Sequence, residues 1–177
     1  CVFYAGIEWY QNAFESEEIL AVSSVPEFDK LNRIQFIHPE RNESTGLQTA
    51  DISTIYKVPV DVSNILNKAC NDCHSNNTIY PWYAEVQPVA WWLNNHVNEG
   101  KGELNFSEFA TYTPARQYHK LEEIKEVIDE GEMPLGSYTL IHTNAKLTDA
   151  EKQTLTTWSE GIRNEMKTKY PADSLVM

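Results

Sequence analysis

The sequence predicts an all-α domain of about four helices, with an irregular N-terminal extension in front of it. Two observations lead to this prediction. Apolar residues recur at helical spacing in four separate segments, and these segments are bounded by residues that typically start or stop helices. We therefore divide the 177 residues into an extension, one helical domain and a tail, which cover residues 1–33, 34–166 and 167–177.

The domain is expected to begin with an irregular segment over residues 34–58. Pro39 favours an extended conformation at His38, and a polar stretch follows as far as Gly46. We expect this segment to cross the surface of the domain as a strap.

The first helix is expected at residues 59–69. Pro59 suits a first helical turn, because the N–H that proline lacks would be unpaired there in any case. The spacing i, i+3, i+4, i+7 places four apolar side chains on one face, namely Val62, Ile65, Leu66 and Ala69.

Three further helices are expected at residues 88–100, 114–130 and 148–166. Gly100 and Gly131 are expected to end the first two, and Thr148 with Glu151 forms a capping box at the start of the last. The expected faces consist of Val89, Leu93, His96 and Val97, then Tyr118, Leu121, Ile124, Val127 and Ile128, then Leu155, Trp158, Ile162 and Met166.

A C-x-x-C-H motif, Cys70-Asn71-Asp72-Cys73-His74, directly follows the first expected helix. Two thiols one helical turn apart can each add to one vinyl group of a haem, and the adjacent histidine can supply a nitrogen ligand to the iron. We therefore predict haem c attached through Cys70 and Cys73, with His74 as an iron ligand. The motif occurs once, so one covalent haem is expected.

Three alternatives compete with a haem at this motif. A thioredoxin-like redox pair would be expected within a βαβ pattern, and no convincing strand lies nearby. A structural zinc site needs four ligands, but the third cysteine is the distant Cys1 and no second pair exists. A disulfide between Cys70 and Cys73 would close a very small loop and stabilise little.

The formal net charge of −12 argues against nucleic acid or an anionic membrane surface as a direct partner. It favours a partner with a basic docking patch, although acidity can also serve only solubility. No apolar run is long enough to span a bilayer.

The first residue, Cys1, is the cysteine left over once the motif binds haem. A bacterial lipoprotein begins with a lipid-carrying cysteine after cleavage, so we expect a lipid anchor on Cys1 and a periplasmic or cell-envelope location. The alternative is an arbitrary boundary of the sequence.

The order of helix, C-x-x-C-H, helices, Met-Pro loop and capped final helix resembles that of class I cytochromes c. A closer resemblance is to the bacterial haem-binding-domain proteins common in Bacteroidetes. It implies a cytochrome c-like fold around one covalent haem outside the cytoplasm. It covers about residues 34–165 and is carried by residues 69–76, 80–83, 88–92, 96, 100–101, 104–109, 133–134 and 147–148.

Met133 is our candidate for the sixth iron ligand. It lies in an expected loop between Gly131 and Gly136, Pro134 stiffens that loop, and the loop precedes the final helix as in class I cytochromes. The runner-up is His96, for which a core histidine hydrogen-bonded to backbone is the simpler interpretation.

These observations favour a monohaem electron carrier or relay subunit of the bacterial cell envelope, which is not an enzyme. A first alternative is a haem-based sensor or peroxidase-like enzyme with a labile sixth ligand, in which His96, His119 or His142 serves as a distal acid–base group. A second is a structural haem subunit of an envelope membrane complex.

Overall fold

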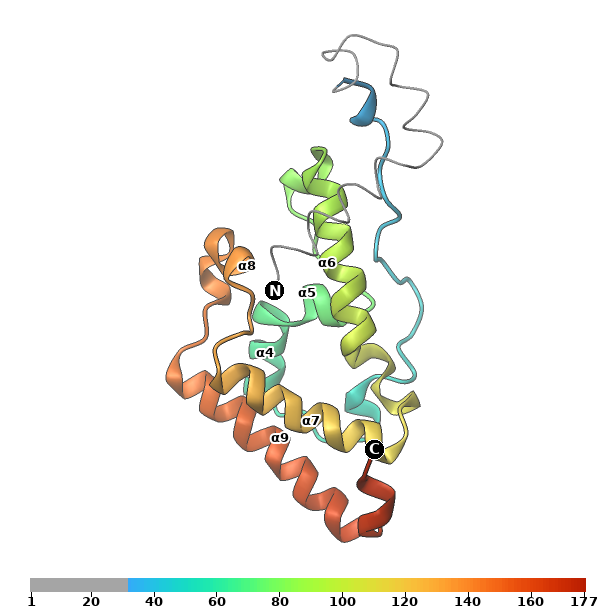
Figure 1. The fold of residues 1–177 in the computed structure, drawn as a ribbon, viewed down its shortest axis with the longest axis vertical. Coiled ribbons are helices and arrows are strands. Elements are labelled where there is room, and N and C mark those ends of the chain that lie inside the picture. Colours follow the sequence, from blue (N-terminus) through green and yellow to red (C-terminus); the bar gives the residue numbers. More distant parts are fainter. Residues whose placement is uncertain (1–31) are drawn as a thin grey trace. The chain divides into compact units, whose positions relative to one another are not determined.

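The computed structural model describes residues 32–177, which contain helices and no β-strand (Figure 1). This confirms the predicted all-α class. Cys1 and its predicted lipid lie outside the described residues. The α-helices are α4 (Val60–Ala69), α5 (Asn71–His74), α6 (Val89–Glu103), α7 (Pro114–Asp129), α8 (Gly136–Ile141) and α9 (Asp149–Lys169). The 3₁₀ turns are η1 (Ile52–Thr54), η2 (Trp82–Glu85), η3 (Phe106–Thr111), η4 (Thr143–Ala145) and η5 (Ala172–Leu175).

The described chain divides into two compact units. The smaller comprises residues 32–39 and 81–92, and the larger comprises residues 40–80 and 93–177. In the smaller unit the backbone N–H of Gln87 donates to Gln35 Oε1 at 2.9 Å, and Gln87 Nε2 donates to the Ile37 carbonyl at 2.5 Å. These bonds hold the two segments of that unit together.

The core of the larger unit lies between α4, α7 and α9, with α7 and α9 running side by side (Figure 1). All four predicted apolar residues of α4 are buried, as are all four of α9. The cluster consists of Ile52, Tyr56, Val62, Ile65, Leu66, Phe106, Phe109, Leu121, Ile124, Ile128, Leu155, Trp158, Ile162, Met166 and Leu175. The helical spacing in the sequence therefore identified most of this core.

Side chains cap the starts of α7 and α9. Thr113 Oγ1 accepts from the Arg116 N–H at the start of α7, and Pro114 occupies the first turn. At α9 the predicted capping box is present, because Thr148 and Glu151 each accept from the other's backbone N–H.

The prediction that Gly100 ends its helix is wrong. Helix α6 continues through Gly100 to Glu103. The glycine allows α6 to approach Cys73 closely and does not make a turn. Two short helices, α5 and α8, were not expected as separate elements. Segments of four and six residues are too short to show a helical period of apolar residues. Within residues 167–177, α9 extends to Lys169 and Leu175 is buried in the core.

No helix within residues 32–177 combines the length and the hydrophobicity that a membrane crossing requires.

Candidate haem-binding site

The C-x-x-C-H motif consists of Cys70, which joins α4 to α5, and the four residues of α5. The Cys70 N–H donates to the Leu66 carbonyl at 2.9 Å, which completes the last turn of α4. The Cys70 carbonyl then accepts from the N–H groups of Cys73 at 3.1 Å and His74 at 2.9 Å. This turn places the two cysteines one helical turn apart, which is the spacing that two haem vinyl groups require.

Both motif cysteines are free thiols and partly buried. Burial, together with the neighbouring Cys73, raises the pKa of Cys70 to about 12; burial, together with Asp72, raises that of Cys73 to about 11. A thioredoxin-like pair would lie in a βαβ unit, and the described residues around the motif form helices and no β-strand. The structure therefore disfavours the thioredoxin-like alternative.

The remaining alternatives also lack support. The two thiols are unpaired, so no disulfide links them. In the part of the chain that the structure describes, no three His, Cys, Asp or Glu side chains gather in an arrangement that could hold a metal ion. A zinc site at the motif would need such a group.

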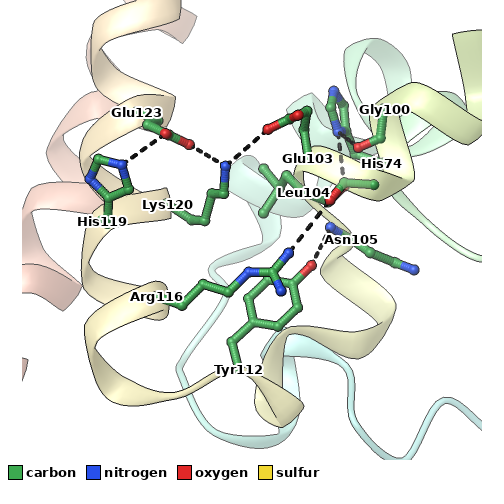
Figure 2. A network of polar contacts seen from close by, with 11 residues as sticks. His74, Gly100, Glu103, Leu104, Asn105, Tyr112, Arg116, His119, Lys120 and Glu123 are labelled. Atoms are coloured by element: carbon green, nitrogen blue, oxygen red, sulfur yellow. Dashed lines mark hydrogen bonds and ion pairs between the residues drawn. The ribbon is translucent and has the colours of Figure 1, made fainter. Parts of the chain in front are cut away.

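His74 is oriented by backbone carbonyls of α6 and the residue after it. Its Nδ1 lies 3.0 Å from the Gly100 oxygen and 3.0 Å from the Leu104 oxygen (Figure 2). Carbonyl oxygens only accept, so the proton resides on Nδ1 and the lone pair on Nε2. Burial lowers the pKa of His74, which favours the neutral imidazole that binds metals. A donor bond from the far ring nitrogen is the usual support of a metal-binding histidine.

Gly100 allows α6 to lie directly against the motif. A Cβ atom at this position would lie 2.8 Å from the Cys73 carbonyl oxygen and 3.1 Å from Cys73 Cβ. Only glycine permits this approach without a shift of backbone. The same glycine supplies one of the two carbonyls that orient His74.

The segment after the motif is held by the strap. Asn42 Nδ2 donates to the Ser75 carbonyl at 2.8 Å and to Thr78 Oγ1 at 2.9 Å, while the Asn42 N–H donates to Tyr80 Oη at 2.7 Å. Lys101 Nζ donates to Asn42 Oδ1 at 2.6 Å. One asparagine side chain thus ties the end of the motif to the strap and to α6.

Met133 lies in the connection between α7 and α8, where its side chain is partly buried. Its N–H donates to the Val127 carbonyl at 3.2 Å, and Gly131 makes the preceding turn with φ of 75°. Farther along, the Tyr138 hydroxyl on α8 donates to Asp72 Oδ2 at 2.7 Å. The helix that follows the methionine loop is therefore bonded to the interior of the C-x-x-C-H motif.

Two of the other candidate histidines lie on helices, and His142 lies in the link between α8 and η4. His96 on α6 has a side chain 20% exposed, and its Nδ1 lies 3.6 Å from Glu99 Oε2. His119 Nε2 on α7 lies 3.0 Å from Glu123 Oε1. The His142 ring stacks on the Tyr138 ring, with centroids 4.3 Å apart. Each of these three rings therefore already contacts an identified neighbour.

A cavity of about 510 Å³ lies beside the motif, but ten of its fifteen lining residues are polar. Neither cysteine of the motif nor His74 lines it. Haem needs a largely apolar pocket, so we do not take this cavity as its site. The lining consists of Gln48, Asp51, Ile52, Ser53, Val58, Ser63, Leu66, Asn67, Asn71, Asp72, Ser75, Asn77, Ile79, Phe106 and Ser107.

Sequence reasoning missed a charged network next to His74. Lys120 on α7 bridges Glu103 at the end of α6 and Glu123 on its own helix, and His119 joins the same glutamate (Figure 2). The i, i+3 and i, i+4 spacings on α7 are visible in the sequence. The link to Glu103 depends on the packing of two helices.

The donor set fits a haem. Two neutral thiols stand one turn apart, the next residue presents a metal-binding imidazole nitrogen, and a glycine keeps the adjacent helix close. An all-α domain built around this site defines a haem-binding protein. A family model described as "Haem-binding domain" matches residues 31–161. The chain belongs to this family, and comparisons with curated proteins and with solved structures gave no match.

Proposed function

We propose that this protein is a monohaem c-type cytochrome that transfers electrons in the bacterial cell envelope. The observation that carries the proposal is the pairing of the C-x-x-C-H thiols with a histidine whose Nδ1 is already bound by two carbonyls. When bound, the haem supplies one-electron exchange between its ferric and ferrous states. A carrier of this kind needs no catalytic residue.

Cys70 and Cys73 would hold the group covalently. Each S–H would add across the double bond of one vinyl group, so that sulfur bonds to one carbon and hydrogen to the other. No oxidant or reductant is needed for this addition. The attachment makes the haem resistant to acid extraction, which is the simplest property to test.

His74 would hold the iron through Nε2. The Gly100 and Leu104 carbonyls fix the plane of the ring and withdraw the Nδ1 proton toward oxygen, which makes Nε2 a stronger donor. A stronger donor favours the ferric state, so these two bonds also help to set the reduction potential.

Met133 would supply the second protein ligand to the iron. Its loop begins at the Gly131 turn, and Tyr138 bonds the helix after it to Asp72 in the motif. Both ends of the loop are thus fixed, which reduces the entropy cost of holding a thioether at the iron. His96 remains the rival ligand.

The proposal also includes a partner and a location. The net charge of −12 suits a redox partner or membrane complex that offers a basic patch. A location outside the cytoplasm rests on the resemblance to bacterial haem-binding-domain proteins.

The test is an absorption spectrum of the protein purified from its native host, followed by a haem assay after acid–acetone extraction. We expect haem to remain on the polypeptide. The double variant Cys70→Ala/Cys73→Ala should lose it, whereas Cys1→Ala should retain it and controls for loss of a thiol elsewhere. Acid-stable haem in the double variant would overturn the assignment.

A further inference from the structure

Lys120 is a nearly buried cation close to the proposed iron ligand. Its side chain is 12% exposed, and its Nζ lies 3.2 Å from Glu103 Oε2 and 2.6 Å from Glu123 Oε2. Burial acts to lower the pKa of Lys120, but the hydrogen bonds that it donates to Glu123 and Glu103 outweigh burial and raise it. The side chain is therefore a permanent positive charge at neutral pH.

Glu103 connects this cation to the histidine. It is the last residue of α6, and the next residue, Leu104, supplies one of the carbonyls that accept from His74 Nδ1 (Figure 2). Lys120 is thus joined through Glu103 to the segment whose carbonyl accepts from the imidazole, so both charges lie on the side of the proposed iron ligand. Charges on this side would act on an iron atom held by that ring.

We propose that Lys120 and Glu103 tune the reduction potential of the haem iron from the His74 side, with Lys120 raising it and Glu103 lowering it. This inference rests on the proposed haem function. Reduction adds one negative charge at the iron. A nearby cation stabilises that charge and a nearby anion destabilises it, by an amount that grows as water is excluded.

The exposure of the Lys120 and Glu103 side chains predicts which of them shifts the reduction potential more. Lys120 is 12% exposed, whereas Glu103 is 80% exposed and is therefore strongly screened by solvent. Lysine should accordingly shift the potential more than glutamate. Glu123 is a second anion at the same lysine, so removal of Lys120 also leaves that anion uncompensated.

The experiment measures the midpoint potential of the haem-loaded protein by spectroelectrochemistry in wild type, Lys120→Met and Glu103→Gln. We expect a lower potential in Lys120→Met and a smaller rise in Glu103→Gln. Lys120→Arg keeps the charge and should restore most of the wild-type value. Lys125→Met is the matched control on α7, because Lys125 is 37% exposed and pairs with Asp129.

The outcomes separate this inference from the proposed function. An unchanged potential in Lys120→Met, with acid-stable haem and an unaltered low-spin spectrum, overturns the inference and leaves the function intact. The inference is also overturned if Lys125→Met shifts the midpoint potential as much as Lys120→Met does. The potential would then respond to surface charge in general and not to the position of Lys120. If Lys120→Met does not fold, the sign of the shift in Glu103→Gln decides, and a potential that fails to rise overturns the inference. Wild-type protein without acid-stable haem overturns the proposed function itself.

Discussion

The hydroxyl of Tyr138 donates to Asp72 Oδ2 at 2.7 Å, and this bond links α8 to one of the two residues between the motif cysteines. Asp72 Oδ1 accepts from the Ile79 N–H at 3.0 Å, so one carboxylate joins three parts of the chain. Because α8 follows the loop that carries Met133, we expect the bond to hold that loop in place relative to the motif.

Replacing Tyr138 with Phe should lower the free energy of unfolding by about 1 kcal/mol, which is typical for one lost hydrogen bond. The haem-loaded variant should also show a weaker far-red sulfur-to-iron band, since the methionine loop is less firmly held. Urea unfolding and ferric absorption spectra measure the two effects. Tyr118→Phe is the control, because it keeps the ring over which Arg163 lies. A Tyr138→Phe protein with wild-type stability and spectrum would contradict this role.

Gly100→Ala should be strongly destabilising, because the added Cβ would lie 2.8 Å from the Cys73 carbonyl oxygen. Overpacking of this kind costs about 1–3 kcal/mol. The displaced backbone should also reduce the yield of acid-stable haem, since Gly100 helps to orient His74. Gly102→Ala is the matched control in the same helix, where a Cβ would meet nothing within 4 Å. Equal stability of the two variants in urea would show that the close approach is unimportant.

Met133→Ala should convert the ferric iron to a high-spin or water-bound state and remove the far-red band. His96→Ala should leave the low-spin spectrum intact. Met166→Leu is the control for loss of a thioether, because Met166 is fully buried in the core. If His96→Ala loses the low-spin spectrum while Met133→Ala keeps it, the haem has two histidine ligands. A wild-type iron that is already high-spin and binds cyanide would instead favour the sensor or peroxidase-like alternative.

The ion pair between Lys68 on α4 and Glu151 on α9 predicts an acid-sensitive contribution to stability. The hydrogen bond from Lys68, with further bonds from Thr148, lowers the pKa of Glu151 from 4.5 to about 2. A lowered folded-state pKa means that the stabilisation is complete above pH 4.5 and is lost as the pH falls toward 2. Both side chains are about a quarter exposed, so the contribution is on the order of 1 kcal/mol after screening.

Unfolding measured between pH 7 and pH 2.5 tests this contribution. Glu151→Gln should be less stable than wild type at neutral pH, and the difference should shrink as the solution is acidified. Glu160→Gln, an exposed position on the same helix, should follow the wild-type profile. If the loss of stability in Glu151→Gln stays the same at low pH, the contribution of Glu151 comes from the cap geometry and not from its charge.

The sequence alone predicted the four longer helices and the C-x-x-C-H motif, because both are local. Apolar spacing within α4 and α9 identified side chains that the structure buries, such as Leu66 and Leu155. The capping box at Thr148 was readable for the same reason, since its two partners are three residues apart. The C-x-x-C-H motif consists of only five consecutive residues, so it could be recognised without a fold.

Tertiary structure decided how the motif is supported, because those contacts join residues distant in sequence. The carbonyls that orient His74 lie 26 and 30 residues away, and Tyr138 lies 66 residues from Asp72. Gly100 shows the difference most clearly. In the sequence a glycine after an apolar segment indicates a helix end, but in the fold Gly100 remains helical. A glycine is needed there because a Cβ atom would lie 2.8 Å from the Cys73 carbonyl oxygen.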